Sequence, residues 1–125
     1  ERRLAEDWVK RLKVRTPGIH TLCLNLSGGN QQKVVLAKWL NAQSRILILD
    51  HPTRGLDVGA KEEVYELIRA VTAEGVAVIL TSDTLEETIG LSHTVLVMRD
   101  GGITHRADAS PGRKPKQVDL IGHMV

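Results

Sequence analysis

Cysteine and aromatic residues are scarce in this chain. Its 125 residues include one cysteine, Cys23, together with two tryptophans, one tyrosine and no phenylalanine. A single cysteine excludes a disulfide framework, and the apolar neighbours Leu22 and Leu24 predict that Cys23 is a small buried residue. So few aromatic rings argue against a surface that stacks nucleic-acid bases. We therefore expect Trp8 and Trp39 to serve packing.

Net charge and long apolar runs are also small. Lys and Arg number 17 against 15 Asp and Glu, which leaves a formal charge of +2. That surplus is too small to indicate a nucleic-acid partner by itself. No apolar stretch approaches the roughly 18 residues of a membrane span, and no secretory signal opens the chain. Four dispersed histidines lack the spacing of a zinc site. They are His20, His93, His105 and His123.

A further absence concerns nucleotide binding. No Gly-x-x-x-x-Gly-Lys-[Ser/Thr] phosphate loop occurs anywhere in the chain. At 125 residues and 42% hydrophobic content, the chain is long enough for one core and too short for two ordinary domains. It starts at Glu1 without a methionine, and we expect it to be a piece of a longer protein.

Helical and strand patterns alternate along the chain. Helices are expected over 1–12, from the Ser-Gly-Gly turn to 42–44, and over 59–74, 85–91 and 117–124. Strands are expected over 45–50, 76–80, 94–98 and 103–106, the last two joined by a hairpin turn at 100–102. This order predicts an α/β fold with a mostly parallel sheet covered by helices and a C-terminal β-hairpin.

Two burial patterns follow from the same periodicity. The unbroken apolar runs at 45–50 and 76–80 predict fully buried central strands. In the second helix, Val34, Ala37 and Leu40 fall on one face, with Lys33 on another. We therefore expect the three apolar residues to form the packed face of that helix.

The turn Ser27-Gly28-Gly29 opens the second helix. Unpaired backbone N–H groups and the positive end of the helix dipole meet at such a position, and glycine lets the backbone approach a ligand closely. The turn is therefore suited to a terminal phosphate. The alternative is an ordinary helix start that Ser27 caps.

A carboxylate and a short polar turn follow the strand at 45–50. Asp50 ends that strand, at the edge where open α/β sheets bind ligands, and it is suited to a hydrated Mg²⁺ that bridges phosphates. Alternatively, Asp50 merely begins a turn. Asp57 closes the run Arg54-Gly55-Leu56-Asp57 and is expected to cap the third helix.

Three segments together resemble a known family. They are Leu26–Lys33 (LSGGNQQK), Ile46–Asp50, which is similar to a Walker B strand, and Pro52–Lys61 (PTRGLDVGAK). They resemble the second nucleotide-binding half of the ATPase subunits of ABC importers for simple sugars such as ribose, galactose and xylose. The resemblance extends from about Glu1 to Gly101.

The resemblance implies a fold and a set of roles. Residues 1–44 would be part of the helical signature subdomain, and residues 45–125 the C-terminal part of a RecA-like ATPase core. Ser27, Gly28, Gly29 and Gln31 would contact, in trans, ATP held by the phosphate loop of the other nucleotide-binding half. Asp50 would hold Mg²⁺ through water. Asp57 would belong to the D-loop, which touches the partner across the same interface.

Two positions depart from the family pattern. His51 stands where the family normally has the Glu that polarises the attacking water, and general-base assistance is worth about 10²- to 10⁴-fold in rate. The site is therefore expected to be impaired, unless His51 acts as a competent base. Asp83 stands at the switch position, where many family members have a His that contacts the γ-phosphate. A carboxylate there is electrostatically unfavourable beside a phosphate.

The resemblance also implies a cellular setting. The complete protein would be an ATPase at the cytoplasmic face of the inner membrane. It would be bound to permease subunits and coupled indirectly to a periplasmic sugar-binding protein, with no nucleic acid as a partner. The isolated chain, without a phosphate loop, would bind ATP weakly or not at all and would not hydrolyse it. Two alternatives stay open: a soluble ABC-type ATPase acting on DNA or ribosomes, and a non-catalytic module for dimerisation and permease contact.

Overall fold

A computed structural model describes residues 1–125, which form two compact units, Glu1–Ile79 and Leu80–Val125. The first unit contains α1 (Arg2–Arg11), the 3₁₀ turn η1 (Cys23–Asn25), α2 (Gly28–Asn41), β1 (Ile46–Asp50) and α3 (Val58–Ala73). The strand β2 (Ala77–Thr81) crosses from the first unit into the second. The second unit contains α4 (Leu85–Leu91), β3 (Thr94–Arg99), β4 (Gly102–Asp108) and α5 (Gln117–Ile121). The predicted elements are therefore present, in the predicted order.

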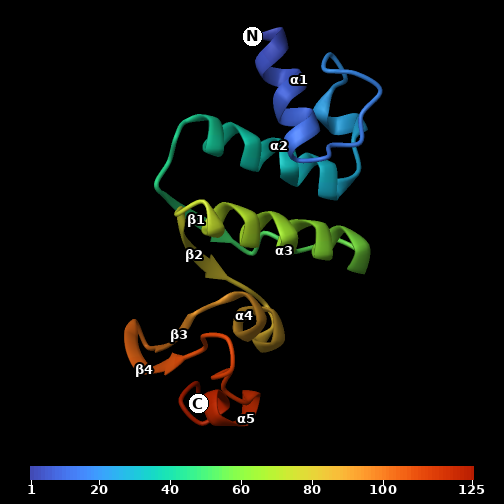
Figure 1. Cartoon of the computed structure of the whole chain (residues 1–125). Helices are drawn as coiled ribbons and strands as arrows, with labels where there is room; N and C mark the ends of the chain where they lie inside the picture. The colour runs from blue at the N-terminus through green and yellow to red at the C-terminus, as the bar shows by residue number, and fades with distance from the viewer. The chain divides into compact units, whose positions relative to one another are not determined.

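In the first unit, α2 and α3 pack against each other and run side by side (Figure 1). The side chains that α3 buries are Val64, Ile68 and Val71, which recur at helical spacing on one face. The face that α2 buries differs from the prediction. Lys33 and Leu36 are buried, whereas Val34 is 38% exposed. The reason is a charged partner on α3, described below, which lets a lysine occupy a packed position.

The strands β1 and β2 form a two-stranded sheet, and α3 provides the crossover between them that a parallel pair requires. The backbone N–H of Ala77 donates to the carbonyl of Arg45 at 2.9 Å. The prediction that both strands are fully buried is wrong: Leu47 is buried, but Ile46 and Ile48 are 63% and 72% exposed. Successive side chains of a strand point to opposite faces, and only one face of β1 is covered here.

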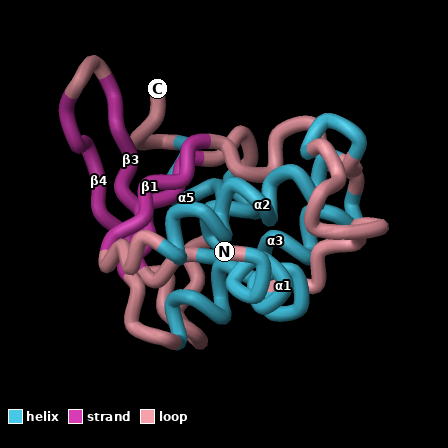
Figure 2. Tube along the Cα trace, turned by 90° about the horizontal axis from the view of Figure 1, so that it is seen from above, coloured by secondary structure: helices cyan, strands magenta, loops and turns pink.

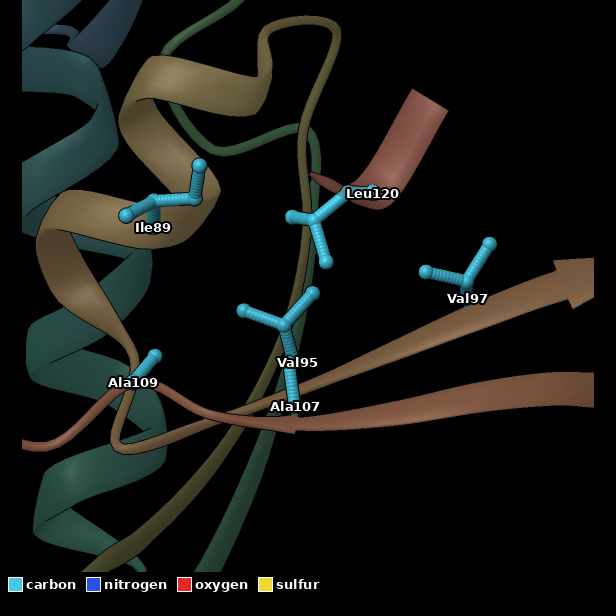
Figure 3. Packing of buried hydrophobic residues seen from close by; sticks show 6 residues of the cluster. All are labelled: Ile89, Val95, Val97, Ala107, Ala109 and Leu120. Carbon is cyan, nitrogen blue, oxygen red and sulfur yellow. The ribbon is translucent and has the colours of Figure 1, made fainter. Parts of the chain in front are cut away.

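The second unit is built on the predicted hairpin. β3 and β4 pair antiparallel, with a bulge between Val97 and Met98, and Figure 2 shows the two strands joined at one end by a loop. Asp100 and Gly101 at the turn have φ values of 50° and 80°. Two successive positive φ angles match the type I′ turn that favours Asp-Gly. A hydrophobic cluster lies between this hairpin, α4 and α5 (Figure 3); it consists of Ile89, Val95, Val97, Ala107, Ala109 and Leu120.

Some single residues also lie elsewhere than predicted. Cys23 is exposed rather than buried, because η1 places it beside Leu22 and Leu24, which are themselves 69% and 87% exposed. Trp39 is half exposed, with the Lys38 ammonium 5.3 Å from its ring centre. Trp8 is half-buried and donates from Nε1 to Asn41 Oδ1 at 3.1 Å, so it joins α1 to the end of α2. No helix is both long and apolar enough to cross a bilayer.

Candidate functional site

The predicted phosphate turn lies at the N-terminus of α2. Ser27 is the N-cap residue and has an extended backbone, and its carbonyl accepts the first intrahelical hydrogen bond, from Gln31 N at 2.9 Å. The amides of Gly28, Gly29 and Asn30 precede that bond, as at any helix start. Ser27 and Gly28 are exposed, whereas Gly29 and Asn30 are buried. An anion can therefore reach this turn from the side of Ser27 and Gly28.

The Ser27 hydroxyl does not cap the helix. It makes no hydrogen bond to a backbone N–H of α2; instead, Asn30 Nδ2 donates to Ser27 Oγ at 2.8 Å. The Asn30 Oδ1 atom in turn accepts from the backbone N–H of Arg15 at 2.8 Å. Gln31 donates from Nε2 to the Leu26 carbonyl at 2.8 Å, which ties its amide to the turn itself. Sequence reasoning missed the part of Asn30, although it lies inside the motif.

Both glycines of the turn face the start of α3. A Cβ atom on Gly29 would lie 2.9 Å from the Cβ of Ala60, and one on Gly28 would lie 3.1 Å from Leu56 Cδ2. The first distance is shorter than real Cβ contacts, so Gly29 is needed for the close approach of α2 to α3. The sequence predicts that these glycines contact an anion, and this stays a prediction. The structure shows that they pack against the start of α3.

Asp57 caps α3, as predicted. Its Oδ1 accepts from Ala60 N at 2.8 Å. Two hydrogen-bonded turns lead from β1 to this cap, one from Arg54 N to the His51 carbonyl and one from Leu56 N to the Thr53 carbonyl. The contacts of Leu56 and Ala60 place the segment around Asp57 beside the Ser27 turn. The structure therefore brings together two of the three predicted site segments.

An ion pair between the buried Lys33 and the partly exposed Glu63 joins α2 to α3. Lys33 is 4% exposed, and its ammonium lies 2.8 Å from Glu63 Oε2 on α3; it also donates to the Lys13 carbonyl at 3.2 Å. The Arg15 guanidinium binds the other oxygen of Glu63 at 3.1 Å. The hydrogen bond from Lys33 holds the pKa of Glu63 below its usual value, and the charges of Lys33 and Arg15 lower it further.

Asp50 and His51 stand at the end of β1. The Asp50 side chain is 79% exposed, and its Oδ1 lies 3.6 Å from Nε2 of the half-buried His51. His51 has a φ of 48°, a left-handed conformation that is uncommon outside glycine. No group of three or more acidic, histidine or cysteine side chains forms a metal cage. One exposed carboxylate nevertheless fits Mg²⁺, which usually takes one or two protein carboxylates, phosphates and water.

Asp83 belongs to the second unit, whereas Asp50 belongs to the first. It is exposed and lies between β2 and α4, where the Thr84 side chain caps α4 by accepting from Glu87 N at 3.3 Å. A further hydrogen bond joins Ser82 Oγ to the Glu87 carboxylate in the same turn. A shared role for Asp83 and Asp50 stays a prediction.

The fold is that of an ATP-binding cassette. The chain superimposes on a solved ATP-binding cassette of an ABC transporter with a TM-score of 0.77 and 16% identity, over 98% of this chain and 49% of that one. A dimeric post-hydrolysis cassette bound to ADP and Pi matches with a TM-score of 0.72 and 21% identity, over 87% of this chain and 47% of that one. Residues 2–54 match the family model described as ABC transporter.

The most informative relatives are import proteins. The chain is 48% identical, over 99% of its length, to a ribose/galactose/methyl galactoside import ATP-binding protein of Pseudomonas syringae pv. tomato. It is 51% identical, again over 99% of its length, to a protein of the same description from Pseudomonas savastanoi pv. phaseolicola. Over almost its whole length the chain is therefore similar to these import ATP-binding proteins, and its residues 2–54 match the ABC transporter family. It spans 24% of the length of each of these two relatives.

Proposed function

We propose that this chain is part of the ATP-binding subunit of an ABC importer for simple sugars such as ribose or galactose. In the complete protein it would take part in coupling ATP binding and hydrolysis to import. The observation that carries the proposal is the exposed Ser27-Gly28 turn, in which the Ser27 hydroxyl makes no capping hydrogen bond to α2. The relatives described as ribose and galactose import proteins support the choice of substrate class.

In this proposal the turn acts on a nucleotide held elsewhere. The chain contains no phosphate loop, so Ser27, Gly28 and Gly29 would close over ATP bound to the other nucleotide-binding half. The helix dipole of α2 and its first amides favour the negative charge of a terminal phosphate. Gln31 supports this turn through its bond to Leu26, and Asp57 would meet the partner half across the same interface.

Asp50 and His51 would serve the chain's own half. Mg²⁺ supplies charge neutralisation on the phosphates when it is bound, and Asp50 is the carboxylate that would hold it, through water. His51 would stand beside the attacking water in place of the usual Glu, and Asp83 would occupy the switch position. This side of the chain is therefore proposed to be the weaker one. Alone, without a phosphate loop, the chain would bind ATP weakly and would not turn it over.

The proposed setting follows from the same relatives. The subunit would lie at the cytoplasmic face of the inner membrane, against permease subunits, and a periplasmic sugar-binding protein would act through them. The import descriptions of the relatives favour this setting over a DNA- or ribosome-associated ATPase. The choice of sugar would rest with the permease and the binding protein.

The proposal is tested by blocking the turn in the full-length subunit assembled with its permease. Ser27→Arg places a bulky side chain at the proposed phosphate contact. ATP turnover should fall by about 10²- to 10³-fold, the usual effect of removing one preorganised hydrogen-bond donor that stabilises a reacting anion. ATP binding should persist, because the phosphate loop lies elsewhere. Ala73→Arg, at the exposed far end of α3, adds the same side chain and should leave both unchanged. Full turnover in Ser27→Arg would overturn the proposal.

A further inference from the structure

Asn30 makes two hydrogen bonds in opposite directions. It is 6% exposed, and it stands in the first turn of α2 between the Ser27 hydroxyl and the segment that follows α1. Arg15 N donates to Asn30 Oδ1 at 2.8 Å, and Asn30 Nδ2 donates to Ser27 Oγ at 2.8 Å. The buried amide therefore connects the backbone of Arg15 to the hydroxyl of Ser27.

The proton positions in this chain of bonds are fixed by chemistry. A backbone N–H can only donate, so the atom that faces Arg15 N must be the amide oxygen of Asn30. The nitrogen of the amide then faces Ser27, and an NH₂ group can also only donate. Ser27 Oγ must accept in this bond. Its own hydrogen consequently points away from Asn30.

Arg15 is itself held in place. Its guanidinium binds Glu63 Oε1 at 3.1 Å, and Glu63 is bound by the buried Lys33 at 2.8 Å. The N–H that orients Asn30 therefore belongs to a residue tied to both α2 and α3. Rotation of the Asn30 amide by half a turn would place two donors face to face at Arg15. The ordered side chains thus select one orientation of the amide.

We propose that Asn30 is a positioning residue that holds the Ser27 hydroxyl as a hydrogen-bond donor toward a terminal phosphate. This inference rests on the proposed function of the Ser27 turn. Phosphate oxygens carry negative charge and accept hydrogen bonds, so a hydroxyl whose hydrogen points outward matches them, and bonds to charged groups are the stronger kind. Ser27 alone could rotate its hydrogen into the turn; Asn30 prevents that.

The decisive substitution is Asn30→Asp in the full-length subunit assembled with its permease. Aspartate keeps the size of asparagine, and one of its oxygens can still accept from Arg15 N. Its other oxygen accepts rather than donates, so the Ser27 hydrogen turns inward to it. Loss of a hydrogen bond to a charged group is expected to lower turnover at saturating Mg-ATP by about 10- to 100-fold.

A double-mutant cycle with Ser27→Ala separates positioning from a general structural effect. If Asn30 acts through the hydroxyl, Asn30→Asp should cause a clearly smaller loss once Ser27 is Ala, and the loss that remains reflects repulsion between the new carboxylate and the phosphate. If Ser27→Ala lowers turnover and the two losses multiply, the inference is overturned while the proposed function stands. If Ser27→Ala leaves turnover unchanged, both are overturned.

Asn30→Ala provides a second cycle that does not depend on the folding of the aspartate variant. Removing the amide frees the Ser27 hydroxyl to rotate, so turnover should fall by less than in Asn30→Asp. This smaller loss should vanish in the Ser27→Ala background. A loss of equal size with and without the hydroxyl would overturn the inference. Hydrogen exchange of the α2 amides shows in each variant whether the helix start is retained.

Discussion

The ion pair of Lys33 and Glu63 makes the stability of the fold depend on pH through a single residue, Glu63. The pKa of Glu63 is lowered in the folded protein, chiefly by its hydrogen bond from Lys33. A carboxyl with a lowered pKa stabilises the fold above its unfolded pKa, and this contribution is lost as the pH falls through the folded value. Stability of the first unit should therefore decrease as the pH falls below about 4.5.

The measurement is a urea unfolding curve at several acidic pH values, followed with a fluorophore on the exposed Cys23 of the same unit. Glu63→Gln should be less stable at neutral pH and should lose less stability on acidification than the unchanged protein. Glu62→Gln, at an exposed position next to it on α3, serves as the control. Equal acid dependence in the unchanged protein and in Glu63→Gln would contradict the prediction.

Sequence reasoning identified part of this site. Ser27, Gly28 and Asp57 could be placed at helix starts because turn and capping signals are local, and the structure confirms that Asp57 caps α3. The Lys33–Glu63 pair could not be predicted, since the two residues come together only when α2 packs on α3. The same holds for the bond between Arg15 and Asn30.

At the scale of elements, the contact between α2 and α3 depends on a glycine. A Cβ on Gly29 would lie 2.9 Å from the Cβ of Ala60, so Gly29→Ala should force the helices apart. Overpacking costs about 1 to 3 kcal/mol, and over most of this range it outweighs the roughly 1 kcal/mol that alanine adds in helix propensity. Hydrogen exchange of the α2 and α3 amides in the full-length protein should show the loss.

Compensation tests the same contact. Ala60→Gly removes the opposing methyl group, so Gly29→Ala combined with Ala60→Gly should recover most of the lost protection. Gly18→Ala is the matched control, because nothing lies within 4 Å of a Cβ at that position. Gly28→Ala should be milder than Gly29→Ala, since the Leu56 side chain can rotate away. Failure of the double variant to recover would show that the clash is not the cause.

The elements themselves were predictable where their signals were local. The Asp100-Gly101 turn has the backbone that its sequence favours, and helices occur over 2–11, 28–41 and 58–73, where the apolar spacing predicts them, although the buried face of α2 differs from the predicted one. The exposure of Ile46 and Ile48 could not be predicted. An apolar run indicates what a strand can bury, whereas burial depends on what lies over each face.

For the whole molecule, the proposed function divides the chemistry of the chain between two nucleotide sites. The Ser27 turn would serve ATP held by another nucleotide-binding half, and it is well ordered by Asn30 and by the packing of Gly29 on Ala60. Asp50 and His51 would serve the chain's own half, where the usual Glu is replaced. The complete protein would therefore contain one competent site and one slow site.

His51→Glu in the full-length subunit tests this asymmetry. A carboxylate at the water-polarising position should raise turnover at the slow site by about 10²- to 10⁴-fold, the usual range for general-base assistance. The backbone turn from Arg54 N to the His51 carbonyl, at 3.1 Å, does not depend on the side chain and should persist. Vanadate should trap nucleotide mainly at one of the two sites in the unchanged protein and at both in His51→Glu. His51→Gln lacks the carboxylate and should change neither the turnover nor the trapping. Unchanged turnover in His51→Glu would show that His51 does not limit the rate.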